Sequence, residues 1–333
     1  MGRRVRVLQL LFFVSALGLL MWLLNKVGWS NIGQALVRVG VSGAILLVAL
    51  GFIESIFDTL ALTFAIGQRR WARVLVIHSV GALVNQVLPF DLGEVVKGGL
   101  THRAFPRGAT IAGTIVWNYA FKLSRPLMIL VAALIGLIAV THIAAPVRYL
   151  FVVGALTAFV PYALFRLILR RGGATTAVHL LRFAKIVRRD PKVILEKARA
   201  IDAIVADFLR ERPGAFVATL ILQIAARIVS GAGLFATLRL LGLTVSLGTG
   251  ALLYAAMNTA ELLLTLAPTR LGTSDGAAFG VFTLLSLPPQ IGVIMYVVFR
   301  VRSLTTTGVL APFAFLTVPP ATPAHESSSP LEA

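Results

Sequence analysis

The chain has 333 residues, of which 58% are apolar and only 13% are charged. Soluble domains have about 45–50% apolar and about 25% charged residues, so there are too few polar side chains here to cover a soluble surface. Lysine and arginine number 31 against 13 acidic residues, a net charge of +18. In so apolar a chain, this excess indicates contact with an anionic membrane face, and no nucleic-acid partner is expected.

The residue types also exclude several kinds of chemistry. The chain has no cysteine, and its five histidines show no paired metal-ligand spacing. Disulfide bonds, thiol catalysis and cysteine-ligated metals are therefore excluded, and neither a metal nor a cofactor is expected. The apolar residues occur in runs close to the ~20 residues that cross a hydrocarbon core. The composition predicts an all-α, polytopic membrane helix bundle.

The N-terminal segment predicts two membrane helices. An apolar run over 7–24 follows three arginines, which favours an uncleaved first helix that begins in the cytoplasm. A second span is expected at about 41–66. It ends at the basic, aromatic cluster 69–73, which is typical of a cytoplasmic interface.

Proline and glycine repeatedly interrupt the next apolar stretch. We expect one membrane helix at about 74–88 and a broken or re-entrant stretch at about 90–105, because proline and paired glycines disfavour regular helix. Two helical pieces are then expected to meet near Pro126. A further span is predicted at about 147–169.

Residues 170–212 form a basic segment between the apolar runs. Asp190 and Pro191 are a plausible helix start, and apolar residues then recur every three or four positions as far as Phe208. This pattern predicts an amphipathic helix. Two placements stay open: the cytoplasmic membrane surface, or packing against the bundle itself.

Apolar runs resume after this segment, at about 214–238, 247–266 and 290–318. Together these runs predict about eight membrane helices in a single integral membrane domain over residues 1–318. Its halves, at about 41–169 and 214–318, are joined by the basic segment. The tail over 319–333 is rich in proline and serine and is expected to be disordered.

The two interrupted regions resemble each other. Each contains Pro-x-x-Leu-Gly after an apolar run and before an acidic residue; the copies begin at Pro89 and Pro268 and end at Gly93 and Gly272, 179 residues apart. Downstream, Phe-Lys-Leu-Ser-Arg (121–125) is matched by Phe-Arg-Val-Arg-Ser (299–303), at an offset of 178. Paired breaks in two halves are a sequence indication of an internal repeat, here expected to be inverted, with a transport site where the breaks meet.

Ionisable residues within apolar helices are costly and therefore informative. One set, with basic residues at matching places beside both breaks, suits the binding of an anionic head group: Asn85, Glu94, Lys122, Arg125, Arg300 and Arg302. A second set could serve as counter-ions or carry protons: Glu54, Asp58, Asp91, Glu261 and Asp275. Structural ion pairs or interfacial anchors are the alternative for most of them.

Asn85 and the run 88–97 (Leu-Pro-Phe-Asp-Leu-Gly-Glu-Val-Val-Lys) resemble the N-x-x-x-P-x-x-x-G-E signature of the lysylphosphatidylglycerol synthase transmembrane, or flippase-like, family. Pro268, Leu271, Gly272 and Arg300 fit its second break and the basic residue that follows. The resemblance covers about residues 5–318, but Asp275 stands where the family has glutamate. It implies an inner-membrane protein with inverted repeats and re-entrant segments.

The best-understood members of that family move an aminoacylated phospholipid between leaflets and carry a soluble aminoacyl-transferase domain. No such domain is expected here after Pro319, so synthase activity is not expected. The leading hypothesis is a lipid translocase of a bacterial inner membrane, which moves an anionic phospholipid or a polyprenyl-linked lipid. The alternatives are an intramembrane transferase with Glu94 as general base, and a non-transporting scaffold for lipid-synthesis enzymes. An enzyme is the less favoured class, because no catalytic constellation is found.

Overall fold

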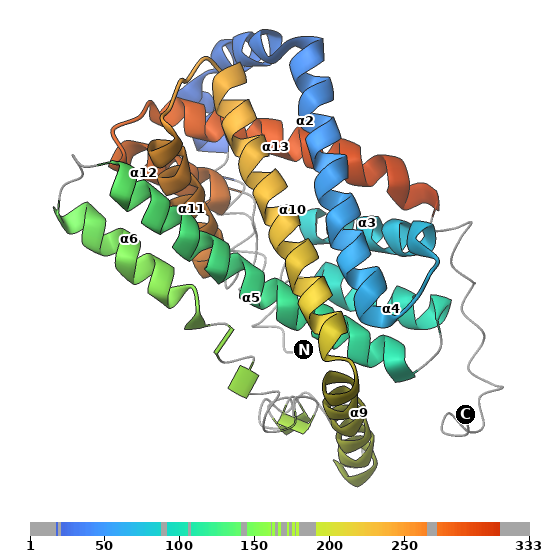
Figure 1. The fold of residues 1–333 in the computed structure, drawn as a ribbon. Helices are drawn as coiled ribbons and strands as arrows, with labels where there is room; N and C mark the ends of the chain where they lie inside the picture. Colours follow the sequence, from blue (N-terminus) through green and yellow to red (C-terminus); the bar gives the residue numbers. More distant parts are fainter. Residues whose placement is uncertain are drawn as a thin grey trace.

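The computed structural model describes residues 18, 21–87, 92–105, 108–140, 145–160, 162–163, 166–167, 172, 175–176, 178–179, 191–264 and 272–313. Over these residues the chain is helical and contains no strand, as the composition predicts. The helices are α2 (Trp29–Ile66), α3 (Trp71–Val87), α4 (Leu92–Ala104), α5 (Gly108–Ala139), α6 (Ala145–Thr157), α9 (Pro191–Glu211), α10 (Pro213–Leu240), α11 (Leu247–Leu264), α12 (Thr273–Leu284) and α13 (Pro289–Leu310), followed by a short 3₁₀ turn, Ala311–Phe313 (Figure 1).

Four of the described helices are long and apolar enough to cross a membrane: Trp29–Ile66, Thr110–Ala139, Pro213–Leu240 and Pro289–Phe313. The shorter helix Trp71–Asn85 is also apolar. The chain therefore has membrane-spanning helices. The expected total of about eight stays a prediction.

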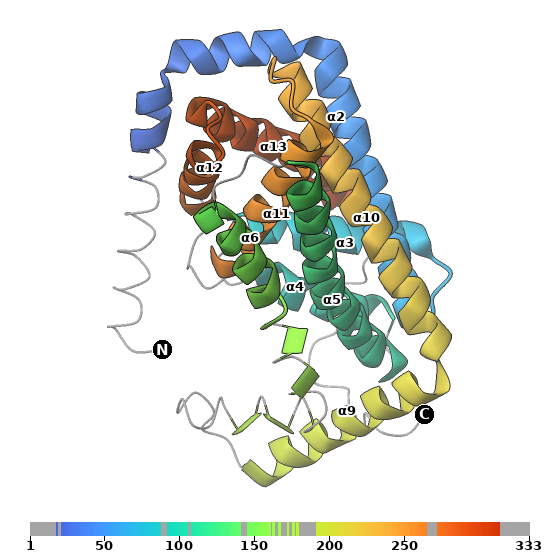
Figure 2. The same ribbon diagram turned by 60° about the vertical axis from the view of Figure 1, so that its left-hand side comes forward.

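Helix α2 has two parts that meet at Gly40. This glycine has a φ of 63°, which breaks the regular helix and which only glycine adopts readily. The first part of α2 lies across one end of the bundle, and the second part runs down beside α10 (Figure 2). The second part begins where the sequence predicts the span 41–66.

The prediction of two helical pieces near Pro126 is wrong. Helix α5 runs without interruption through this proline. Two residues earlier, the hydroxyl of Ser124 donates to the carbonyl oxygen of Phe121 at 3.0 Å. Neighbouring helices and hydroxyl side chains make such prolines tolerable in membrane helices, and α5 contacts α2, α10 and α11 along its length.

The amphipathic helix predicted in the basic segment is α9, and part of its apolar face packs on the bundle. Val205 is buried in one cluster with Ala112 and Val116 of α5, whereas Arg199 and Arg210 are exposed. This packing supports the second of the two placements left open by the sequence. Contact of the exposed basic face with a membrane surface stays a prediction.

The described helices of the two halves follow one order: a long helix, a shorter one, a short one and a long one. These are α2, α3, α4 and α5 in the first half, and α10, α11, α12 and α13 in the second. In both halves, a stretch between the second and third helices lies outside the described part of the chain. Contacts also correspond, because α3 packs on α4 and on α13, while α11 packs on α12 and on α5. The long helices α2 and α10 lie side by side (Figures 1 and 2).

The two motif glycines have different structural roles. Gly93 faces Gly81 of α3, and a Cβ built on Gly93 would lie 1.9 Å from the Gly81 carbonyl oxygen. It therefore permits the close contact of α3 and α4. Gly272 precedes the first turn of α12 with a φ of 76°, a left-handed conformation. Pro89, Asp91 and Pro268 lie outside the described residues.

Candidate functional site

A cavity of about 390 Å³ lies among the long helices, lined from α2, α3, α4, α5, α10, α11 and α13. Much of its described lining is charged. The cations are Lys97, Lys122, Arg125, Arg227 and Arg302, and the carboxylates are Glu54, Asp58, Glu94 and Glu261. Most of these groups are paired, which offsets part of the cost of burying charge in an apolar bundle.

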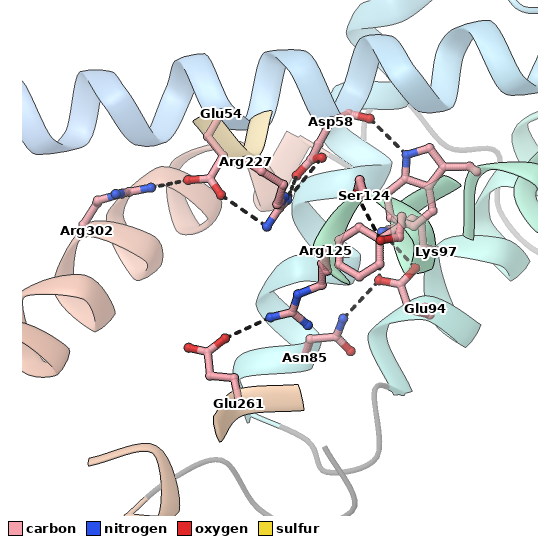
Figure 3. Close-up of polar contacts among 12 residues, drawn as sticks. Glu54, Asp58, Asn85, Glu94, Lys97, Ser124, Arg125, Arg227, Glu261 and Arg302 are labelled. Atoms are coloured by element: carbon pink, nitrogen blue, oxygen red, sulfur yellow. Dashed lines mark hydrogen bonds and ion pairs between the residues drawn. The ribbon is translucent and has the colours of Figure 1, made fainter. Parts of the chain in front are cut away.

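A chain of alternating charges joins α13, α2 and α10 (Figure 3). Arg302 donates to Glu54, whose other oxygen lies 3.8 Å from the Arg227 guanidinium. Arg227 in turn pairs with Asp58 at 3.1 Å. All four side chains are at most 17% exposed, so the carboxylates of α2 hold two helices of the other half.

Asp58 has further partners from buried polar groups. Gln223 is fully buried, and one orientation of its side-chain amide satisfies both the nitrogen and the oxygen. In this orientation the nitrogen donates to Asp58 Oδ1 at 2.9 Å and the oxygen accepts from Trp117 Nε1 at 2.8 Å. The indole also lies 3.2 Å from the Asp58 carbonyl oxygen. A buried carboxylate needs such donors to remain ionised.

A second bridge between the halves connects α5 with α11. Arg125 Nη2 lies 2.9 Å from Glu261 Oε2, and the Tyr296 hydroxyl donates to the other oxygen of Glu261 at 2.7 Å. Residues from both halves therefore hold one carboxylate. In Figure 3 this bridge lies beside the Glu54 and Asp58 network.

The third group orders the start of α4. Lys97 Nζ lies 2.9 and 3.0 Å from the two oxygens of Glu94, and Asn85 donates to Glu94 at 3.2 Å. The Asn85 oxygen accepts from the Gly93 amide at 2.6 Å. Asn85, at the end of α3, therefore fixes the first turn of α4 through both the nitrogen and the oxygen of its side-chain amide.

Aromatic side chains of α5 lie among these cations. Lys97 Nζ is 3.9 Å from the centre of the Trp117 ring, and the guanidinium groups of Arg125 and Arg227 are 5.6 and 5.3 Å from that of Phe121. Such contacts stabilise a desolvated cation. They also hold the cations at fixed places around the cavity.

Arg300 is not part of the described lining, although the sequence groups it with Arg302. It donates to Asp275, which also accepts from the Gly272 amide at 3.0 Å. Residues two positions apart in the sequence project about 200° apart around a helix axis, so Arg300 and Arg302 lie on different faces of α13. The repeat alignment pairs Lys122 with Arg300, whereas it is Arg302 that lines the cavity.

Most of the remaining predicted site residues come together. Those in the lining are Glu54, Asp58, Asn85, Glu94, Lys122, Arg125, Glu261 and Arg302. Lys97, Trp117 and Arg227 are among the members of the site that the sequence did not assign to it. The signal for Arg227 was present, since a lone arginine within an apolar helix requires a partner. In the described parts of the chain, no three acidic or histidine side chains gather to hold a metal ion.

A comparison with known proteins identifies the family of the chain. The family described as "Lysylphosphatidylglycerol synthase TM region" matches residues 6–311, nearly all of the helical part of the chain. No curated protein and no solved structure matches the chain. The chain belongs to the family of lysylphosphatidylglycerol synthase transmembrane regions.

Proposed function

We propose that this protein is a lipid translocase, which moves a phosphate-bearing lipid head group between the leaflets of a bacterial inner membrane. The candidate substrates are an anionic phospholipid and a polyprenyl-linked lipid. The observation that supports this best is the cavity, because a polar space of about 390 Å³ lies among helices long enough to cross a membrane. Membership of a lipid-related membrane family supports the same class.

The head group would be held by Lys122, Arg125 and Arg302. Arginine can bind a phosphate through two parallel hydrogen bonds. Arg125 and Arg302 already pair with Glu261 and Glu54, so a phosphate has to take the place of a carboxylate. A pair that loses one partner leaves a costly buried charge. Lipid binding would therefore weaken the bridges between the halves and allow them to move.

The two halves would then rock against each other as the copies of an inverted repeat, with re-entrant segments at the two breaks. Three features support this part of the proposal. The helices of the halves follow the same order, their contacts are reciprocal, and the carboxylates of Glu54, Asp58 and Glu261 pair with cations of the opposite half.

The orientation proposed has the N-terminus and α9 in the cytoplasm. The basic cluster 69–73 follows α2, and Arg212 lies at the junction of α9 and α10. A Cβ built on Gly67, the residue that ends α2, would lie 3.0 Å from the Arg212 guanidinium. The two basic regions therefore share one end of the bundle, and basic residues concentrate on the cytoplasmic side.

The test is leaflet exchange of a fluorescently labelled phosphatidylglycerol in vesicles reconstituted with the purified protein. We expect faster exchange than in protein-free vesicles, and at least about tenfold slower exchange for Arg125→Gln, because a hydrogen bond between charged groups is lost. Arg210→Gln is the control, since this arginine is 80% exposed on α9.

Two results would contradict the proposal. Exchange equal to that in protein-free vesicles, for several phospholipids and a polyprenyl phosphate, would exclude translocation. Formation of a new lipid from a lipid-linked donor would favour the transferase. The contacts of Glu94 do not favour that alternative, because both its oxygens accept from Lys97, and a neighbouring cation makes a carboxylate a weaker base.

A further inference from the structure

His78 lines the cavity from α3, yet no ion pair described above includes it. His78 is only 7% exposed. Among the described residues, its Nδ1 atom has no hydrogen-bond partner. Buried polar atoms are nearly always paired, and an unpaired one in a cavity indicates a missing ligand or solvent partner.

The surroundings of this imidazole are cationic and aromatic. Its ring meets that of Trp117 edge-on, with 6.1 Å between the ring centres. Lys97 Nζ lies 3.9 Å from the centre of the same Trp117 ring, and Arg227 lines the same cavity. Arg227 also has a buried nitrogen, Nε, without a partner in the described structure. Two buried nitrogens without partners, one from α3 and one from α10, thus lie beside positive charge in the wall of one cavity.

Packing alone does not account for a histidine at this position. The contact with Trp117 uses the edge of the ring, which a phenylalanine would offer without leaving a buried nitrogen unpaired. An anionic oxygen satisfies both requirements, because it accepts from an N–H group and is attracted by the two cations.

We propose that His78 binds a phosphate oxygen of the ligand, with Nδ1–H as the donor and Arg227 Nε–H as a second donor. The identification of the ligand as a lipid phosphate rests on the proposed function. The same chemistry would also accept free inorganic phosphate, and the experiment separates the two sources.

The first measurement is lipid binding by native mass spectrometry, with dioleoylphosphatidylglycerol as probe and dioleoylglycerol as its phosphate-free control. We expect His78→Phe, which keeps the ring beside Trp117, to weaken phosphatidylglycerol binding about tenfold, as for a lost hydrogen bond to a charged group. His78→Asn, which retains an amide N–H near the position of Nδ1, is expected to restore most of the affinity. Binding of dioleoylglycerol should not change in either variant.

The second measurement follows the imidazole itself, by ¹⁵N NMR of protein labelled at histidine. The chain has only five histidines, and the His78 signal is the one absent from His78→Asn. We expect this signal to move when phosphatidylglycerol is added and to stay still with dioleoylglycerol. This readout uses the wild-type protein and does not depend on the folding of a variant.

The outcomes separate this inference from the proposed function. The inference would be overturned, whatever the exchange assay shows, if His78→Phe and wild type bound phosphatidylglycerol equally. It would also be overturned if the His78 signal did not move when the lipid is added. A signal that moves with inorganic phosphate but not with the lipid would support His78 as a phosphate ligand and count against a lipid substrate. A response to phosphatidylglycerol without leaflet exchange would support the inference and contradict the translocase.

Discussion

Arg302 on α13 donates a hydrogen bond to Glu54 on α2, a residue 248 positions earlier in the chain. The same carboxylate lies 3.8 Å from Arg227 on α10. One acidic side chain therefore connects a helix of the first half with two helices of the second. Any movement of the halves against each other has to lengthen at least one of these contacts.

Glu54→Gln is expected to destabilise the folded protein by about 3 kcal/mol, because breaking a buried ion pair leaves its partners with uncompensated charge. The readout is the midpoint of thermal unfolding in detergent. Glu196→Gln, an exposed position on α9, is the control and should leave the midpoint unchanged. Equal midpoints for the two variants would mean that Glu54 does not hold the halves together.

The Arg125–Glu261 bridge allows structure and binding to be tested separately. Arg125→Glu and Glu261→Arg, made singly, place like charges together and should lower the unfolding midpoint. The double variant restores an ion pair with the two charges exchanged between α5 and α11, and the midpoint of thermal unfolding should recover. Leaflet exchange should stay at least about tenfold below wild type, because the cation has moved from α5 to α11. Recovery of exchange together with stability would assign the bridge a purely structural role.

The positions of the helices followed from the sequence because apolar runs and proline or glycine interruptions act locally. The expected spans at 41–66, 214–238 and 247–266 lie close to the helices found. Pro126 was misjudged because its effect depends on its neighbours in space. Helix α5 continues through it and packs on α2, α10 and α11, and a sequence does not show these neighbours.

The site followed from the sequence in its residue types but not in its pairings. Charged residues in apolar helices had to be functional or paired, and most of them line one cavity. Their partners are between 136 and 248 positions away in three cases, so spacing could not identify them. The choice between Arg300 and Arg302 depends on the rotation of α13, which is fixed by packing against α2, α3 and α12.

Gly93→Ala tests why the motif needs a glycine. A Cβ at this position would lie 1.9 Å from the Gly81 carbonyl oxygen and 2.4 Å from the Asn85 side-chain oxygen. We expect α3 and α4 to separate, with an unfolding midpoint below wild type by several degrees and loss of the contact that Asn85 makes with the Gly93 amide. The loss should correspond to about 1–3 kcal/mol, as for overpacking of a close interface.

The matched control for this change lies on the same helix. A Cβ at Gly99 would meet no atom within 4 Å, so Gly99→Ala should be neutral or stabilise α4 by up to about 1 kcal/mol, the difference in helix propensity. If Gly93→Ala behaved like Gly99→Ala, the close contact between α3 and α4 would not be the reason for the glycine of the motif.

The proposed orientation can be tested with unique thiols, because the chain has no cysteine of its own. Gln34 is exposed on the first part of α2 and Arg210 is exposed on α9, and these segments lie at opposite ends of the bundle (Figure 2). In intact spheroplasts, a membrane-impermeant maleimide should label Gln34→Cys. It should label Arg210→Cys only after the membrane is permeabilised, since the basic end is expected in the cytoplasm. The reverse pattern would invert the proposed orientation, and labelling of both in intact spheroplasts would show that the long helices between them do not cross the membrane.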